Sequence, residues 1–311
     1  MTAGAALATL GCVAALSACA GASSHAPAAA ARAASCASAT ADLAAPGPYR
    51  VGSAHVALTR VGASGRSRSI DPTAWFPTAT RSGGPVTCRS ALILFSHGAN
   101  GRATDYSRLL THLAGEGFVV LAPHHPDRQQ GGPGEAGDRT DDMEYLLDHL
   151  GAIADRLAPG LAARIDTGRI GVAGHSFGGF TSADMAATDP RVRAALVMAG
   201  GERGPAAASI RVPVLAMAGG ADHLIPVALV RAFVSRLAAT TPHGLLVIGG
   251  AGHGAYGDGC THGRTCGIVA SYATSFFLTY LDGLRSADGL LDPHRHRAAR
   301  LSLRTVGMPP R

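Results

Sequence analysis

Lysine is absent from this sequence of 311 residues, and arginine supplies all 27 of its basic residues. The excess over 21 acidic residues gives a formal net charge of +6, which is spread thinly along the chain. Aromatic residues are also scarce, at 5%. Because a nucleic-acid surface needs a concentrated basic patch, this composition argues against a nucleic-acid partner.

The N-terminal apolar run lacks the length of a membrane span. Residues 5–18 are too few to cross a bilayer, and a run of this kind is typical of a signal peptide. It ends in Leu-Ser-Ala-Cys at 16–19, which resembles the bacterial lipobox, although no basic residue precedes the run. We expect a signal peptide with lipobox at 1–19 and a flexible Ala/Ser/Pro-rich tether at 20–46. In the alternative, the signal is an ordinary cleaved one and Cys19 is incidental.

Cysteines are few, and two of the six fall within the signal segment. Cys260 and Cys266 lie six residues apart just after a candidate catalytic loop, and we expect them to pair. Cys36 and Cys88 then pair by elimination. Disulfides indicate an extracytoplasmic compartment. A zinc site at Cys260, His262 and Cys266 is the alternative, but the spacing matches no common zinc pattern.

Short apolar runs alternate with amphipathic stretches from residue 49 onward, and 47% hydrophobic residues suffice for a full core. The predicted strands are 49–61, 67–78, 91–96, 118–122, 170–173, 194–199, 212–218 and 245–248. The predicted helices are 104–114, one that Thr140 caps and that carries Met143, Leu146, Leu147, Leu150 and Ile153, 177–187, one opened by Pro226, and 267–284. This alternation predicts an α/β domain over 47–284: a mostly parallel eight-stranded sheet with helices on both faces, edged by an antiparallel hairpin. The Arg-rich residues 285–311 lack periodicity and are expected to form a surface tail.

Between the fifth predicted strand and the next helix, residues 174–178 read Gly-His-Ser-Phe-Gly. This G-x-S-x-G pattern predicts a sharp strand-to-helix turn that exposes the Ser176 hydroxyl as a nucleophile. The glycines are needed because a Cβ there would collide with the neighbouring strand and helix. The alternative is that Ser176 is only a helix N-cap.

Asp222 and His253 follow the seventh and eighth predicted strands. Because ligands bind at the carboxyl ends of parallel strands, we expect both side chains to meet Ser176 there. His253 would act as the base and Asp222 would orient it. The simpler alternatives are a helix cap for Asp222 and an exposed turn residue for His253, with Asp189 as a weaker candidate acid.

Two backbone N–H groups are expected to bind the developing oxyanion. One belongs to Phe177, the residue after the nucleophile. The other belongs to the glycine-bearing loop after the third strand, where Gly98 allows a tight turn. Ala99 is the first candidate for this donor and Asn100 the second.

Two pairs of histidines are the remaining candidates for metal ligands. The pairs His124-His125 and His294-x-His296 could contact a metal, but no set of carboxylate ligands accompanies either pair. His175 is expected to pack within the elbow.

Several motifs resemble a known group of enzymes. Residues 95–101 (Phe-Ser-His-Gly-Ala-Asn-Gly), 113–120 and the elbow resemble platelet-activating-factor acetylhydrolase-type and bacterial dienelactone-hydrolase-like proteins of the α/β-hydrolase superfamily, over roughly 49–284. The resemblance implies an α/β-hydrolase fold and a serine esterase without cofactor that uses Ser176, Asp222 and His253. Dienelactone hydrolases carry a cysteine nucleophile, so their substrate is not expected here.

A second resemblance is to bacterial cutinase-like polyester hydrolases. They share the Gly-His-Ser-x-Gly-Gly elbow and an acid turn like Asp-His-Leu-Ile-Pro at 222–226. Those proteins typically lack the His-Gly of the oxyanion loop, so this interpretation ranks second.

The link between the sixth and seventh strands is too short for a cap domain, so the site is expected to be open. Residues 124–139 form the main wall available for specificity. We therefore predict an exported, monomeric serine carboxylester hydrolase for short-chain or accessible esters, secreted or lipid-anchored at Cys19. A non-catalytic binding protein, a peptidase and a thioesterase are the alternatives of other classes.

Overall fold

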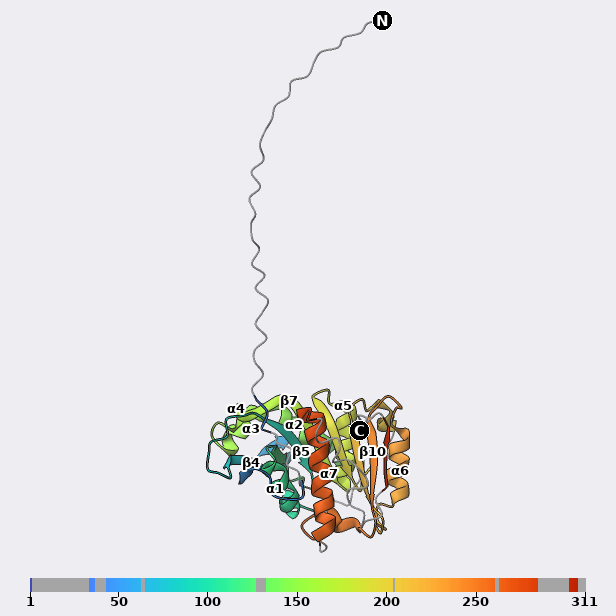
Figure 1. The fold of residues 1–311 in the computed structure, drawn as a ribbon. Coiled ribbons are helices and arrows are strands. Elements are labelled where there is room, and N and C mark those ends of the chain that lie inside the picture. Colours follow the sequence, from blue (N-terminus) through green and yellow to red (C-terminus); the bar gives the residue numbers. More distant parts are fainter. Residues whose placement is uncertain are drawn as a thin grey trace. The chain divides into compact units, whose positions relative to one another are not determined.

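The computed structural model describes Met1 and residues 34–36, 43–62, 65–126, 133–203, 205–260, 263–284 and 302–306 (Figure 1). The predicted signal peptide with Cys19, most of the predicted tether and the pair His294-x-His296 lie outside these residues.

Within the described residues, the central sheet has nine strands in the order β1-β4-β6-β5-β7-β8-β9-β10-β11. Their bounds are β1 Tyr49–His55, β4 Thr73–Thr80, β6 Val119–Ala122, β5 Ser90–Ser96, β7 Ile165–His175, β8 Val192–Met198, β9 Val214–Gly219, β10 His243–Ile248 and β11 Ser302–Val306. The six strands from β6 to β10 are parallel, whereas β1, β4 and β11 run antiparallel to their neighbours. The predicted α/β class and mostly parallel sheet are confirmed.

The ninth strand corrects the prediction of a tail without regular structure at 285–311. β11 pairs with β10, with His243 opposite Val306 and Val247 opposite Ser302. A sheet edge offers a row of unpaired backbone groups, and an added strand needs little side-chain pattern to pair with it. The segment carries only a short alternation, Leu-Ser-Leu-Arg-Thr-Val at 301–306, which does not stand out within the Arg-rich residues around it.

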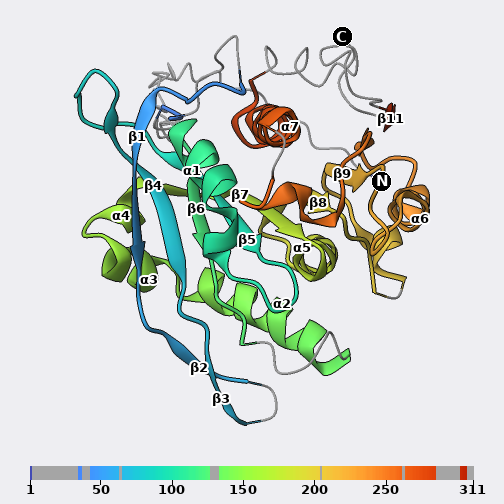
Figure 2. The same ribbon diagram turned by 90° about the horizontal axis from the view of Figure 1, so that it is seen from below.

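The predicted N-terminal hairpin divides into two parts. Its outer segments are β1 and β4 of the main sheet, which pair antiparallel. Its inner segments, β2 (Thr59–Val61) and β3 (Ser67–Ser69), form a separate two-stranded sheet. This small hairpin projects from the main sheet in Figure 2.

Helices cover both faces of the sheet. On one face lie α1 (Ser107–Gly115) and α7 (Gly263–Asp282), and on the other lie α2 (Pro133–Asp148), α3 (Leu150–Leu157), α5 (Phe177–Thr188) and α6 (Val227–Arg236) (Figure 2). The shorter elements are α4 (Leu161–Arg164), η1 (Ala103–Tyr106), η2 (Pro205–Ser209) and η3 (His253–Tyr256).

Strand β5 shows why its sequence is uniformly apolar rather than alternating. Ile93 and Phe95 belong to the hydrophobic cluster under α1 and α7, whereas Leu92 and Leu94 belong to the cluster on the opposite face. Successive side chains of a strand point to opposite faces, so a strand covered on both sides is apolar at every position.

Helix α2 starts earlier than predicted. Thr140 was expected to cap it, but the helix begins at Pro133, a residue that the first helical position accommodates well. Two glycines, Gly134 and Gly137, lower the helix propensity of this first part, so the sequence pattern does not predict it. The predicted helix is also broken at His149, which separates α2 from α3.

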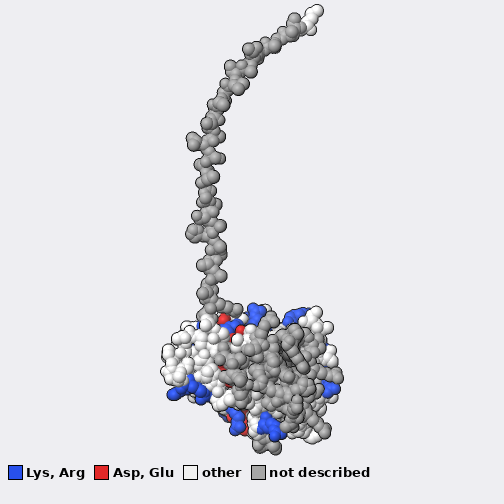
Figure 3. Space-filling model, in the orientation of Figure 1, with Lys and Arg blue, Asp and Glu red and all other residues white. Residues whose placement is uncertain are grey.

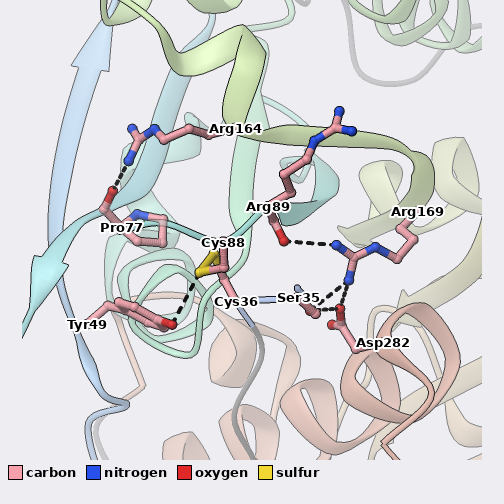
Figure 4. The surroundings of a disulfide bond; sticks show 9 residues. All are labelled: Ser35, Cys36, Tyr49, Pro77, Cys88, Arg89, Arg164, Arg169 and Asp282. Atoms are coloured by element: carbon pink, nitrogen blue, oxygen red, sulfur yellow. Dashed lines mark hydrogen bonds and ion pairs between the residues drawn. A yellow bond between two sulfur atoms is a disulfide. The ribbon is translucent and has the colours of Figure 1, made fainter. Parts of the chain in front are cut away.

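Two disulfides, Cys36–Cys88 and Cys260–Cys266, join the predicted pairs. Figure 4 shows the first, just before the amino end of β5. There the Cys36 N–H donates to the Arg89 carbonyl oxygen (3.1 Å).

Arg169 of β7 bonds Ser35 (2.7 Å) and the Arg89 carbonyl oxygen (2.9 Å), and it also pairs with Asp282. These contacts fasten residues 34–36 to the end of the sheet opposite the strand carboxyl termini.

The described helices include none that is long and apolar enough to cross a membrane. On the face seen in Figure 3, arginine side chains are scattered singly or in small groups rather than gathered into one patch.

Candidate active site

The elbow between β7 and α5 has the strained geometry that the glycine pattern predicts. Ser176 has φ 55° and ψ −121°, a conformation that residues with a side chain rarely adopt. A Cβ on Gly174 would lie 2.1 Å from the Gly178 carbonyl oxygen, and one on Gly178 would lie 1.9 Å from the Ser96 carbonyl oxygen. Only glycine fits these two positions, and the tight packing holds Ser176 at the carboxyl edge of the sheet.

The structure brings Ser176, Asp222 and His253 together. His253 Nε2 lies 3.0 Å from Ser176 Oγ, and His253 Nδ1 lies 2.8 Å from Asp222 Oδ2. Asp222 lies in the turn after β9, and His253 begins η3 just after β10. All three residues therefore follow the carboxyl ends of parallel strands, which explains how positions far apart in the sequence converge.

Asp222 is held as a carboxylate by its turn. Its Oδ1 accepts hydrogen bonds from the backbone N–H groups of Leu224 (2.9 Å) and Ile225 (2.8 Å). Burial acts to raise the pKa of Asp222, but the hydrogen bonds from Ile225 and His253 outweigh it and hold the pKa below its usual range. An ionised Asp222 favours the tautomer in which His253 Nδ1 carries the proton.

The weaker acid candidate, Asp189, is engaged elsewhere. It follows α5, before β8 begins, and its Oδ2 lies 2.6 Å from Arg191 Nη2. Asp189 is therefore part of a structural ion pair, and Asp222 is the carboxylate bonded to His253.

The two predicted oxyanion donors belong to segments that lie next to the nucleophile. Phe177 is the first residue of α5, and Ala99 lies in the turn after β5. Among the described turns and loops, neither backbone N–H group forms a hydrogen bond with another backbone group. By contrast, the Gly98 N–H is occupied, since it donates to the Tyr106 hydroxyl (3.1 Å). Helix α5 also directs the positive end of its dipole toward Ser176, which favours developing negative charge.

His175 is buried beside the site, as expected for the elbow. Its Nδ1 lies 2.7 Å from the Tyr106 hydroxyl, and its ring centroid lies 4.7 Å from that of His253 and 5.0 Å from that of Tyr256. Burial and the neighbouring His253 lower the pKa of His175 to about 3. His175 therefore stays neutral and adds no positive charge that would oppose an imidazolium at His253.

A second Ser-His-Asp constellation lies beneath the oxyanion loop, and sequence reasoning missed it. His125 Nε2 lies 3.0 Å from Ser96 Oγ, and His125 Nδ1 lies 2.9 Å from Asp142 Oδ2. All three residues are at most 1% exposed. A serine closed off from solvent cannot receive a substrate, so these residues are a buried structural network.

One sequence signal points to this network. Arg139 and Asp142 lie on the same helical stripe as the apolar Met143, Leu146 and Leu147, where charged residues are not expected. His125 is engaged in this network rather than presented with His124 as a pair of metal ligands. The described part of the chain contains no group of three or more His, Cys, Asp or Glu side chains arranged to hold a metal ion.

The link between β8 and β9 contains only the short η2 among its described residues, so no cap domain stands there. The loop after β6 belongs to the predicted specificity wall, but its residues 127–132 lie outside the description.

Comparison with known proteins agrees with this geometry. The family described as PET hydrolase-like (PETase) matches residues 25–304. Over 211 residues the chain is 26% identical to Cutinase 1 of Thermobifida cellulosilytica, covering 68% of this chain and 73% of that protein. It is 27% identical to the cutinase of Thermobifida fusca over 211 residues, covering 68% of this chain and 64% of that protein. It is 24% identical to the bis(hydroxyethyl) terephthalate hydrolase of Streptomyces coelicolor over 237 residues, covering 76% and 68% of the two chains.

The superfamily resemblance is confirmed, and within the superfamily the relatives correspond to the cutinase interpretation that the motifs alone ranked second. A strained serine after a parallel strand, a histidine within hydrogen-bond distance and a family match over most of the length agree with one another. The chain therefore belongs to the PET hydrolase-like family of α/β-hydrolases, which makes it a serine-type carboxylic ester hydrolase.

Proposed function

We propose that this enzyme hydrolyses polyesters and their soluble fragments, with Ser176 as nucleophile, His253 as general base and Asp222 as the residue that orients His253. One geometric observation carries the catalytic roles: Ser176 Oγ lies 3.0 Å from His253 Nε2, whose ring is held by Asp222 from the other side. The polymeric substrate is supported by the relatives, which are named as cutinases and as a bis(hydroxyethyl) terephthalate hydrolase.

The reaction follows from these positions. His253 Nε2 takes the proton of Ser176 Oγ as the oxygen attacks the ester carbonyl carbon, and Asp222 stabilises the resulting imidazolium. The carbonyl oxygen becomes an oxyanion that the N–H groups of Phe177 and Ala99 bind. Collapse breaks the bond to the alcohol oxygen, and the alcohol leaves with the proton from His253. A water molecule activated by His253 then releases the acid and regenerates Ser176.

The open site supports a polymeric substrate on steric grounds. No cap domain stands over the described link between β8 and β9. Ser176 and His253 are both partly exposed among the described residues, which is consistent with access by a chain that lies along the surface.

The test separates the catalytic roles from the substrate class. The wild type and Ser176→Ala are compared on p-nitrophenyl butyrate, bis(hydroxyethyl) terephthalate and a poly(ethylene terephthalate) film, and both are treated with a fluorophosphonate probe. We expect the wild type to be labelled and to release terephthalate products, and a folded Ser176→Ala to do neither. Equal rates in the two proteins would refute the roles. Activity on p-nitrophenyl butyrate without any release from the two terephthalate substrates would instead support a short-chain esterase.

We also propose that the enzyme acts outside the cytoplasm, since two disulfides persist in oxidising compartments. Attachment to the membrane through a lipid on Cys19 is the finer proposal. Fractionation of cells producing the wild type or Cys19→Ala tests it: the variant should move from the membrane to the soluble fraction, and an unchanged distribution contradicts the anchor. The expectation of a monomer is checked by light scattering.

A further inference from the structure

Arg139 of α2 is the largest fully buried side chain among the described residues, and it contacts the oxyanion loop directly. Its Nη1 donates to the His97 carbonyl oxygen (2.5 Å) and lies 3.4 Å from Ser96 Oγ. Its Nη2 donates to the Gly98 carbonyl oxygen (3.3 Å). One planar guanidinium group therefore holds the carbonyls of two consecutive peptide units in the loop that carries Ala99.

The Gly98 carbonyl belongs to the same peptide unit as the Ala99 N–H, the second predicted oxyanion donor. This oxygen accepts two further hydrogen bonds, from the Gly101 N–H (3.1 Å) and from His97 Nδ1 (2.7 Å). In a trans peptide the N–H points away from the carbonyl oxygen, so fixing one end of the unit fixes the direction of the other. Donors on the oxygen also polarise the unit and strengthen the N–H as a donor.

The same guanidinium also contacts the side chain of Phe177, whose backbone N–H is the first predicted donor. Its Cζ lies 4.4 Å from the centroid of the Phe177 ring, a distance at which a cation and an aromatic face attract each other. Arg139 thus contacts the Phe177 side chain and the peptide unit of Ala99, although it lies in neither α5 nor the loop after β5.

A polar network holds this arrangement from behind. His97 Nε2 accepts the His125 N–H (3.0 Å), so its proton lies on Nδ1, toward Gly98. Burial, with the neighbouring His125 and Arg139, holds the pKa of His97 well below its usual range. Asp142, bonded to His125, also pairs with Arg60 and with Arg68 (2.9 Å) of the small β2–β3 sheet. The oxyanion loop is therefore braced by α2 and by that sheet.

We propose that Arg139 is a positioning residue for catalysis, which orients and polarises the Gly98–Ala99 peptide so that its N–H stabilises the oxyanion. This inference rests on the proposed function of Ser176 and deepens it. Arg139 is buried and does not contact the substrate. Its effect should therefore appear in the transition state, where the oxyanion is fully charged, more than in substrate binding.

The test uses Arg139→Lys, Arg139→Gln and the matched control Arg169→Lys. Arg169 is also a buried arginine, but it binds Ser35, Asp282 and Arg89 near the Cys36–Cys88 disulfide (Figure 4), away from the carboxyl edge of the sheet. Each full-length protein is assayed for kcat and KM on a p-nitrophenyl ester and on the matching thionoester. Sulfur accepts hydrogen bonds weakly, so the ratio of the two kcat values reports oxyanion binding. Because both substrates see the same preparation, the ratio does not depend on the folded fraction.

We expect kcat for the ester to fall roughly 10- to 100-fold in Arg139→Gln, less in Arg139→Lys, with KM nearly unchanged and the ester-to-thionoester ratio reduced. Arg169→Lys should lose thermal stability and keep both kcat and the ratio. An active Arg139→Gln with an unchanged ratio would overturn the inference, as would a loss of the same kind in Arg169→Lys. A wild type without ester hydrolysis or probe labelling would refute the proposed function itself.

Discussion

The buried carboxyl of Glu116 should make the stability of the protein depend on pH, separately from the active site. It follows α1, is fully buried, and neither carboxyl oxygen has a hydrogen-bond partner among the described residues. Burial raises the pKa of Glu116 from its usual 4.5 to about 7, and the charge of Arg81 offsets only part of this effect.

The sign follows from linkage. The folded protein binds the Glu116 proton more tightly than the unfolded chain does, so its free energy of unfolding falls as the pH rises from about 4.5 to about 7. At 1.36 kcal/mol for each pKa unit, the penalty above pH 7 is at most about 3 kcal/mol. Glu116→Gln has nearly the shape of the protonated acid and cannot ionise, so it should remove that penalty.

The assay is urea unfolding of the wild type and Glu116→Gln between pH 4.5 and 8.5, with the disulfides intact. The two proteins should be about equally stable at pH 4.5, and the stability of the variant relative to the wild type should increase up to about pH 7 and then level off. Glu144→Gln is the comparison, because burial and the neighbouring Asp189 raise the pKa of this half-buried carboxyl too, and its gain should be smaller. A difference between wild type and Glu116→Gln that stays constant with pH would refute the reasoning.

Three further predictions concern the site and its framework. Asp222→Asn should keep the fold and lose about 10⁴-fold in kcat on p-nitrophenyl butyrate, because an amide neither holds the right tautomer nor stabilises the imidazolium; a loss below tenfold would contradict the role. Replacing Cys36 and Cys88 by serine should lower the free energy of unfolding in urea by about 4 kcal/mol, and replacing Cys260 and Cys266 should lower it by about 2 kcal/mol. The first loss is larger because the first disulfide closes a loop of 52 residues and the second a loop of 6. The opposite order would contradict the entropic argument. Gly178→Ala should abolish soluble protein that reacts with the probe, because the added Cβ would collide with the Ser96 carbonyl oxygen. Gly151→Ala in α3, where an added Cβ meets nothing, should instead raise the free energy of unfolding by about 0.5–1 kcal/mol.

The local sequence was enough to bring out the sheet and the three residues at its carboxyl edge. Strands covered on both faces are apolar at every position, as β5 is, and the rule that parallel strands end at one edge then groups Ser176, Asp222 and His253. The structure places these three within hydrogen-bond distance, while their catalytic roles stay predictions for the assays above.

Other features were decided by contacts between distant segments. β11 forms because the edge of β10 offers unpaired backbone groups. This edge exists only in the folded sheet, so residues 302–306 alone do not reveal it. The early start of α2 has a local cause instead, because the glycines of its first part lower the helix propensity there.

The sequence by itself determined the fold class, the elbow and the order of nucleophile, acid and base, because each depends on periodicity or on a backbone turn that only glycine permits. Only the tertiary structure decided that Arg139 lies against the peptide of Ala99, that Tyr106 joins Gly98 to His175, and that His125 and Asp142 stand behind them. The physical reason is that a buried charge or hydroxyl is tolerated only where partners from other segments meet it, and those partners exist only once the chain has folded.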